Sequence, residues 1–489
     1  MDNIILCGMQ FGDEGKGSFT DWIVHERDAD CIVRYNGGCH ASHTVQLGDG
    51  TIHKFAQLGS GMFKKDVHTY ITKEVPVNPD SLLREVHEFS RTSGEDIDEI
   101  LSRIHIHKGC LIVTPYHKLV NWMRELSLGD DRRGSVGTGV SEVPILKSAS
   151  LCGWHKNLGM SMDELYNGRI GTIMGRMESL QEYASDFYEK HKDCIWENCP
   201  EELREHMEGN IHYLLDDKAY MRISSDYYDR HPGCGILKKC LYSTYEETIR
   251  THKTAVWEGA QGVLLDREHG IAPNTTNLVT THEPALNLMY LKDRIEVVGI
   301  AKAFCSRHGM GVFPTEDKNL NISDKNQMGS FWNGNPRYGW FDAVLFKYAN
   351  RAIGADSMFL SCMDELAGME KVKICHKYKY HGKVDDGFSE LFAYVQSDGY
   401  VYITDIKKNA PGLKEYLVQC TPEYFEAKGW VLPETANAKW VYEACGEFIR
   451  AIEDFTGCIV EAVSFGPTRH EKIRLMEPDH VVIRHEYFM

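Results

Sequence analysis

The sequence predicts an α/β fold in which helices flank a large, mainly parallel β-sheet. The first observation is the opening order of an apolar run, a glycine-rich turn, a helical segment and a second apolar run. The second is a series of further short apolar runs along the chain. Strand, turn, helix and strand in this order begin a parallel sheet, because the helix carries the chain back between parallel strands.

Each predicted element rests on a local pattern. Residues 3–8 (NIILCG) are β-branched and apolar and end in glycine, which indicates a buried strand. Residues 18–26 place Phe19, Trp22 and Ile23 at helical spacing, and residues 31–35 (CIVRY) predict the next strand. The remaining apolar runs predict strands at residues 111–114, 254–258, 296–301, 357–361 and 459–464.

Two stretches depart from this alternation. Residues 158–250 are rich in Glu, Tyr, Met and Lys with few β-branched runs, which predicts a helix-rich insertion. Residues 377–404 alternate tyrosines and valines with polar residues, which indicates antiparallel strands at an edge. Because no linker rich in Pro, Gly or Ser interrupts the chain, we predict a single domain over residues 1–489.

Composition restricts the classes of function. The chain has 71 acidic and 54 basic residues and a formal net charge of -17, which argues against binding nucleic acid or an anionic membrane surface. A nucleotide substrate is still compatible, because a local pocket can be positive on an acidic protein. The 15 cysteines lack the spacing of zinc or dithiol motifs, which predicts reduced thiols. The amino-terminal apolar run is too short for a signal peptide or a membrane span, so we expect a cytoplasmic protein.

The first motif that indicates chemistry lies between the first strand and the first helix, at residues 8–18 (GMQFGDEGKGS). Glycines let the backbone approach phosphate oxygens, a helix N-terminus attracts anions, and Lys16 adds a point charge. The loop is not a Walker A motif, because Gln10 stands where that motif needs glycine. A tight glycine turn with a surface acidic pair is the alternative interpretation. A lysine between glycines has little packing purpose, so we predict a phosphate-binding loop with contacts from Gly12, Glu14, Gly15, Lys16, Gly17 and Ser18.

The hexapeptide GDEGKG at residues 12–17, followed by RYNGGCHASHTV at residues 34–45, resembles the opening signature of the adenylosuccinate synthetase family. The resemblance implies that Asp13 removes the purine N1 proton and binds Mg²⁺, and that His43 is the acid beside the purine oxygen. Such a carboxylate and imidazole can move a proton without bulk water. In the family, the backbone carbonyl of a glycine contacts Mg²⁺ at the position that Ser42 occupies in this chain. The resemblance also implies that Ser42, His43 and Thr44 contact the nucleotide.

Two later blocks extend the resemblance. Residues 257–266 (WEGAQGVLLD) are similar to the family segment in which the amide matched by Gln261 binds the purine oxygen. Downstream, Thr276 matches a phosphate-binding threonine of the family. Residues 302–316 (KAFCSRHGMGVFPTE) are similar to a further family stretch, whose glycines let backbone approach a ligand.

The nucleotide donor is predicted from residues 359–364 (FLSCMD). The family places Thr-Lys-x-Asp here, with the aspartate accepting the two guanine N–H donors, and this chain has Cys362, Met363 and Asp364. Residues Ser464, Phe465 and Gly466 resemble the family's second wall around the guanine. The resemblance therefore implies GTP, and a buried capping aspartate is the alternative interpretation of Asp364.

Several positions differ from the family pattern. In residues 134–139 (GSVGTG) the threonine that holds a 5′-phosphate is replaced by Val136, beside Ser135. His40 replaces an asparagine, and residues 147–151 (KSASL) offer no match for an arginine that crosses the family's dimer interface. In the loop that binds the amino acid, two threonines become Phe331 and Trp332, one arginine becomes Asn335, and Arg337 keeps another. Asparagine cannot replace the charge of arginine toward a carboxylate.

The resemblance covers nearly the whole chain, from residue 4 to about 473, and implies a homodimer. It predicts a GTP-dependent C–N ligase of purine biosynthesis that uses Mg²⁺, phosphorylates the purine 6-oxygen of IMP and joins aspartate to give adenylosuccinate. One alternative is a paralogue that uses a 2-amino or deoxy purine nucleotide, or a different amine. Another is a nucleotide-binding sensor without turnover, although a sensor need not keep Asp13, Lys16, His43 and Gln261.

Overall fold

The computed structural model describes residues 1–151, 157–245, 248–290, 293–323, 329 and 331–475. A ten-stranded sheet forms the centre of the molecule, and its neighbouring strands are parallel except at one edge, where β17 and β18 are antiparallel. The fold class predicted from the sequence is therefore confirmed. The strand order is β18 (Lys472–Arg474), β17 (Val460–Ser464), β12 (Ser357–Ser361), β9 (Arg294–Lys302), β1 (Asp2–Gly8), β8 (Thr254–Gly262), β2 (Cys31–Arg34), β5 (His68–Ile71), β6 (Ile104–His107) and β7 (Leu241–Tyr242).

The apolar runs predict most of these strands, but the strand predicted at residues 111–114 is wrong. Leu111 and Ile112 form only isolated bridges, to Ser161 and Val77. The run is apolar because it is packed in the core, where Ile112 and Val113 are buried. It ends at once in a helix, because Thr114 caps α4 (Pro115–Ser127).

A second sheet has the order β10 (Phe304–Arg307), β11 (Arg337–Asp342), β13 (Lys371–Tyr380), β15 (Tyr400–Ile406) and β14 (Phe392–Ser397), and β16 (Cys420–Lys428) also pairs with β13. The antiparallel strands predicted within residues 377–404 are confirmed in the pairs β13–β15 and β14–β15. They belong to this second sheet and not to an edge of the main one. A short pair, β3 (His43–Gln46) and β4 (Ile52–Phe55), completes the strands.

Helices cover the main sheet and extend beyond it. In α1 (Lys16–Glu26), Phe19 and Ile23 pack against Ile4, Leu6 and Phe359 of β1 and β12. Each such fully buried side chain contributes roughly 1.5–3 kcal/mol. The other helices are α2 (Pro79–Ser93), α3 (Ile97–Ser102), α5 (Glu142–Leu151), α6 (Met162–Asn167), α7 (Ile170–Asn198), α8 (Glu201–Leu215), α9 (Ala219–Tyr228), α10 (Glu283–Leu286), α11 (Ala343–Ile353), α12 (Asp386–Leu391), α13 (Leu413–Leu417), α14 (Ala438–Ala444) and α15 (Gly446–Thr456).

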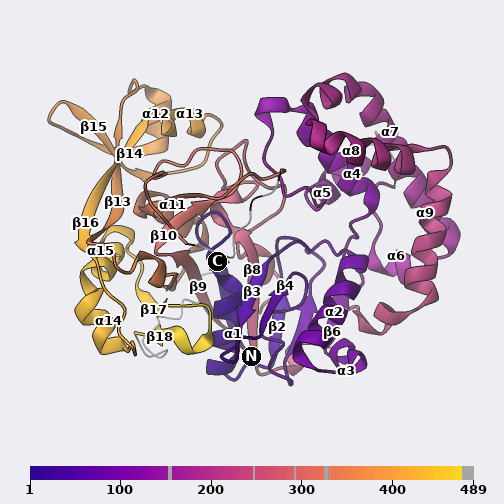
Figure 1. The fold of residues 1–489 in the computed structure, drawn as a ribbon, viewed down its shortest axis with the longest axis horizontal. Helices are drawn as coiled ribbons and strands as arrows, with labels where there is room; N and C mark the ends of the chain where they lie inside the picture. The colour runs from indigo at the N-terminus through magenta and orange to yellow at the C-terminus, as the bar shows by residue number, and fades with distance from the viewer. Residues whose placement is uncertain (152–156, 246–247, 291–292, 324–328, 330, 476–489) are drawn as a thin grey trace.

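The helix-rich segment and the second sheet lie on opposite sides of the molecule. Figure 1 shows α7, α8 and α9 at the upper right and β13–β16 at the upper left, with the main sheet below and between them. Within residues 158–250, α6 to α9 are followed by short helical turns and by β7, which returns the chain to the main sheet. The assignment of the whole chain to one domain stays a prediction. No helix in the described part of the chain is long and apolar enough to cross a membrane.

Parallel pairing gives β1, β2, β8, β12 and β17 a common carboxyl-terminal edge. Most of the predicted site residues lie at the ends of these strands or in the segments that follow them, whereas Ser135 follows α4, and Asn335 and Arg337 lie just before and at the start of β11. Ligands of open α/β sheets bind at this edge.

Candidate active site

The phosphate loop is folded around one buried carboxylate. Glu14 is fully buried, and its Oε1 accepts hydrogen bonds from the backbone N–H groups of Gln10 (2.9 Å) and Gly12 (2.8 Å). Lys16 is also buried and its Nζ donates to Glu14 Oε2 (2.6 Å) and to the Gly12 carbonyl oxygen (2.7 Å). Gly15 takes the left-handed conformation at the N-cap of α1, with a φ of 81°. The structure thus places Glu14 inside the loop as its organiser, whereas the sequence predicts it as a nucleotide contact.

His43 lies directly beside this loop. A Cβ atom added at Gly17 would lie 2.5 Å from the His43 Cβ, so the close packing of α1 on β3 requires glycine there. The Nδ1 atom of His43 is 2.6 Å from Glu258 Oε1 of β8. Ser42, the predicted magnesium contact, is exposed immediately before His43, and Thr44 continues β3 opposite Lys54.

Glu258 is held by four groups and was missed by the sequence analysis. The fully buried carboxylate accepts hydrogen bonds from the Ser60 backbone N–H (3.0 Å) and hydroxyl, pairs with His43, and lies 3.9 Å from Arg34 Nε. Although burial raises the pKa of Glu258, Arg34 and the hydrogen-bonded His43 outweigh it and hold this pKa at about 2. Burial lowers the pKa of His43, and the Glu258 charge opposes that shift. An ionised Glu258 fixes the His43 Nδ1–H toward itself, so that the Nε2 atom is the one available to a ligand. The block at residues 257–266 that resembles the family contains Glu258, but no sequence pattern identifies the residues that its carboxylate contacts.

Asp13 faces a second histidine that was also missed. Its carboxylate is 40% exposed, and Asp13 Oδ2 lies 3.7 Å from His308 Nε2, just after β10. Partial burial raises the pKa of Asp13, and the neighbouring Lys302 and His308 oppose this shift without cancelling it. The Nδ1 atom of His308 is buried without a hydrogen-bond partner among the described residues. The segment at residues 302–316 was singled out for its glycines, and only the fold brings His308 to Asp13.

Gln261 ends β8 in a strained conformation next to the phosphate loop. Its φ is 61°, which non-glycine residues rarely adopt, and its neighbour Gly262 pairs with Gly8 of β1. The Oε1 atom of Gln261 is buried without a partner in the described part of the chain. Strained residues and unsatisfied buried polar atoms concentrate at ligand sites.

The residues predicted to surround the guanine converge on the same loop. Cys362 has a φ of 58° at the end of β12, and Met363 donates from its backbone N–H to the Ser464 carbonyl oxygen (2.9 Å). Burial raises the pKa of Asp364 to about 6. The hydroxyls of Ser361 and Ser18 bond the carbonyl oxygens of Glu14 (2.8 Å) and Pro467 (3.0 Å), so the phosphate loop contacts both walls. The Ser464 hydroxyl donates to the Gly466 carbonyl oxygen (2.8 Å), with Phe465 buried between them.

The residues predicted to bind the purine nucleotide are partly engaged in their own loops. Ser135 Oγ donates to Asn121 Oδ1 (3.1 Å) and accepts from the Gly137 N–H (3.3 Å). Thr276 Oγ1 lies 3.3 Å from Ser141 Oγ, which joins the two predicted phosphate-binding segments. His40 has a buried Nδ1 without a partner in the described ranges, and burial together with Arg34 lowers its pKa to about 4.

In the predicted amino-acid loop, Arg337 is engaged while Asn335 is exposed. Arg337 donates to Glu316 Oε2 (2.8 Å) and to the carbonyl oxygens of Gly309 (3.0 Å) and Gly311 (2.9 Å). It lies opposite Arg307 across the β10–β11 pair. Arg307 is buried, its Nη1 donates to the Val312 carbonyl oxygen (2.8 Å), and burial lowers its pKa to about 9. Two cations therefore border this loop.

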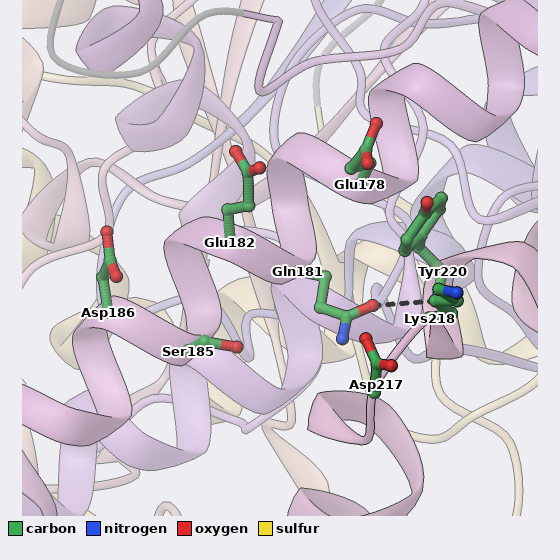
Figure 2. Close-up of a pocket in the computed structure, with 8 residues that line it drawn as sticks. All are labelled: Glu178, Gln181, Glu182, Ser185, Asp186, Asp217, Lys218 and Tyr220. Carbon is green, nitrogen blue, oxygen red and sulfur yellow. Dashed lines mark hydrogen bonds between the residues drawn. The ribbon is translucent and has the colours of Figure 1, made fainter.

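A separate acidic hollow lies on the helix-rich segment (Figure 2). Gln181 crosses it, accepting from the Tyr220 backbone N–H (2.8 Å) and the Tyr116 hydroxyl (3.3 Å) and donating to the Asp216 carbonyl oxygen (2.7 Å). This amide ties α4, α7 and α9 together. No predicted site residue lines the hollow, whose walls are Glu178, Gln181, Glu182, Ser185, Asp186, Asp217, Lys218 and Tyr220.

Comparison with known proteins places this geometry in a family. Residues 5–473 match the family model described as adenylosuccinate synthetase. The adenylosuccinate synthetase of Geotalea daltonii is 28% identical over 501 aligned positions, which cover 98% of this chain and 99% of the relative. That of Bacillus subtilis is 28% identical and covers 96% and 97% of the two chains.

Two solved structures are similar in fold. Fully ligated adenylosuccinate synthetase from Plasmodium falciparum superimposes with a TM-score of 0.75 at 20% identity, covering 96% of this chain and 99% of that one. Succinoaminodeoxyadenylate synthetase of cyanophage S-2L, bound to dGMP and to dATP as an energy donor, gives a TM-score of 0.54 at 14% identity over 97% and 96% of the two chains.

Proposed function

The chain belongs to the adenylosuccinate synthetase family of GTP-dependent C–N ligases, and from this premise we propose that it phosphorylates the 6-oxygen of a purine nucleotide and replaces it with an amine. The observation that carries the proposal is the meeting of three groups at one edge of the sheet. These are the phosphate loop with Lys16, the His43–Glu258 pair packed on that loop, and Asp13.

In the first step, Asp13 takes the proton from N1 of the purine, and the electron pair moves to the 6-oxygen. This oxygen forms a bond to the γ-phosphorus of GTP while the bond to the β-phosphate oxygen breaks, releasing GDP. The partly exposed Asp13 carboxylate is open to the substrate and can accept this proton. In its protonated form, His43 donates its Nε2–H to the 6-oxygen, while Glu258 accepts the Nδ1–H and favours the charged ring. Gln261 supplies an amide beside it.

In the second step, the amine nitrogen attacks C6, phosphate leaves with the 6-oxygen, and the amine loses a proton. A Mg²⁺ ion fits the donors present, because Mg²⁺ binds one or two carboxylates together with substrate phosphates. Asp13 would hold it by its partly exposed carboxylate, and Ser42 by its backbone carbonyl. The bound ion would neutralise charge on the phosphates.

IMP and aspartate are the substrates that we propose first, because they define the family. Asp364 and the Ser464–Gly466 wall favour guanine in the donor. A different purine nucleotide is a second candidate, because the Ser135 hydroxyl is engaged by Asn121 and Val136 offers no hydroxyl. The fold similarity to the cyanophage enzyme bound to dGMP supports keeping deoxy and 2-amino nucleotides in the test.

A substrate matrix tests the proposal. Purified protein is offered IMP, GMP, dIMP or dGMP with GTP or ATP, Mg²⁺ and a panel of amino acids, and products are identified by mass. Adenylosuccinate from IMP, GTP and aspartate supports the first candidate, and a product only from another nucleotide or amine supports the second. Nucleotide binding without any product would instead support the sensor. The same preparation, assayed by light scattering, tests the proposed homodimer, and fractionation of the native host tests the proposed cytoplasmic location.

A further inference from the structure

Two aromatic side chains replace the threonines of the amino-acid loop, and the structure shows what they contact. The Trp332 ring stacks on the Trp122 ring of α4, with centroids 5.7 Å apart and an interplanar angle of 3°. Phe331 packs edge-on against Trp332 at 5.1 Å, and the Arg132 guanidinium lies 5.4 Å over the Phe331 ring. Offset stacks of this kind stabilise by more than the area that they bury.

The same two indoles hold the turn that is predicted to bind the purine nucleotide. Trp122 Nε1 donates a hydrogen bond to the Gly137 carbonyl oxygen (2.8 Å). A Cβ atom added at Gly137 would lie 2.8 Å from Trp332 Cδ1 and 3.0 Å from Trp122 Nε1. Both rings therefore lie directly against Gly137, in the middle of the turn at residues 134–139.

The loop is fastened at a further point. The Asn333 carbonyl oxygen accepts a hydrogen bond from the Gly309 N–H (2.6 Å), in the turn that follows His308. A few residues on, Arg337 donates to the carbonyl oxygens of Gly309 and Gly311 in that same turn. The segment from Phe331 to Arg337 thus connects α4, the nucleotide turn and the turn beside Asp13.

We propose that the Trp122–Trp332 stack is a clamp that holds the amine-binding loop against the nucleotide-binding turn, with Trp332 as a positioning residue. This inference rests on the proposed function, because it concerns where the two substrates of that reaction meet. In this chain the two aromatic residues do not supply hydroxyls to the amino acid. They fix the distance between the loop that binds the amine and the turn that binds the nucleotide, and preorganised loops lose less entropy when substrate binds.

The test compares Trp332→Ala with Trp332→Phe. Trp332→Ala should raise the KM for the amine by about tenfold, because one stacked aromatic contact is lost. The KM for GTP should stay within twofold of the wild-type value. Trp332→Phe keeps a ring on Trp122 and should recover most of the affinity. Trp196→Phe is the matched control, because Trp196 lies on α7 and donates to the Tyr188 hydroxyl, and neither residue is a predicted site residue.

A measurement that does not depend on turnover tests the Trp122–Trp332 clamp separately from the proposed reaction. Two indoles stacked this closely couple electronically, so we expect a coupled pair of bands (a couplet) in circular dichroism of wild type. Trp332→Ala and Trp332→Phe should both abolish this couplet, and Trp196→Phe should keep it. The clamp is refuted if Trp332→Ala keeps this couplet, or if it loses the couplet without changing the KM for the amine. If wild type gives no product with any substrate pair, the proposed function is refuted instead. A couplet in that protein would then show that the two indoles stack, but not that the stack serves this reaction.

Discussion

At the scale of single residues, the His43–Glu258 pair carries a specific kinetic consequence. Glu258→Gln keeps the shape of the side chain but removes the charge that orients His43 and holds its Nδ1 proton. We expect kcat to fall by ~10²–10⁴-fold, the usual contribution of a positioned proton-transfer group. Steady-state kinetics with the product identified in the substrate matrix measure this change.

The control for Glu258→Gln is another buried glutamate. Glu85 accepts backbone hydrogen bonds from Ala56, Gln57 and Leu58, and it is not one of the predicted site residues. Glu85→Gln should affect the melting temperature more than kcat. If Glu258→Gln retains over a tenth of wild-type kcat while folded, His43 does not depend on Glu258.

A second residue-scale prediction concerns pH. The pKa of Asp364 is raised to about 6 by burial, so its carboxylate is ionised above this value and protonated below it. Only the ionised form accepts both guanine N–H donors, so GTP affinity should fall as pH falls through 6, by about tenfold between pH 7 and pH 5. Calorimetry without the purine substrate measures this affinity free of turnover.

In Asp364→Asn the pH dependence should disappear, and GTP should bind more weakly than to wild type at pH 7. A wild-type affinity that is constant from pH 7 to pH 5 would remove Asp364 from the guanine site. A wild type that prefers ATP would show that the guanine prediction itself is wrong.

At the scale of elements, the contact between α1 and β3 depends on Gly17. Gly17→Ala would place a Cβ atom 2.5 Å from the His43 Cβ, so the strand or the helix must shift. Because small displacements of catalytic groups are costly, we expect kcat to fall by about 100-fold in a protein that remains folded. Gly171→Ala is the matched control, since Gly171 lies in α7 with no atom near its added Cβ, and it should leave kcat unchanged. Equal kinetics in the two variants would contradict the predicted role of this contact.

Elements are also where sequence and structure differ most clearly. Buried parallel strands could be predicted because continuous apolar runs such as residues 357–361 have few other uses, and β12 has these same bounds. Residues 111–114 are a similar apolar run, but they pack in the core and end in the cap of a helix, a distinction that no local pattern contains. The site shows the same limit. Motifs singled out Asp13 and His43 as candidates. Glu258, which is 215 residues from His43 in the chain, reaches it only because β8 lies between β1 and β2 in the sheet.

The loop before β11 yields a prediction about the amine. Arg337 is engaged by Glu316, and Asn335 is exposed and uncharged, so the described residues 331–337 offer little free positive charge to a second carboxylate. Asn335→Arg should tighten aspartate binding by about 1–3 kcal/mol if aspartate is the substrate, through a charge-assisted hydrogen bond. The KM for aspartate measures this. An unchanged KM, with wild type already saturated at low aspartate, would show that other residues hold the second carboxylate.

At the scale of the whole molecule, the donor site joins segments far apart in the chain. The phosphate loop at residues 8–18 bonds to Ser361 at the end of β12 and to Pro467 after β17. These strands are neighbours in the sheet, so a nucleotide that contacts all three loops links the amino-terminal, central and carboxyl-terminal parts of the fold.

Such a ligand should stabilise the entire molecule against heat. A ligand that binds only the folded state at 100 times its Kd adds about 2.7 kcal/mol to the free energy of unfolding. For a chain of 489 residues this corresponds to a rise in Tm of about 2–3 °C. We expect this rise with GTP at pH 7 and a smaller one with ATP at the same concentration, because adenine lacks the N1–H and 2-amino donors whose hydrogen bonds Asp364 accepts.

Differential scanning calorimetry of wild type and Asp364→Asn measures these shifts in Tm. In Asp364→Asn the difference between GTP and ATP should shrink, while the part that arises from Lys16 and the phosphate loop remains. Equal shifts for both nucleotides in wild type would mean that the phosphates alone are recognised and that the loops after β12 and β17 do not select the base.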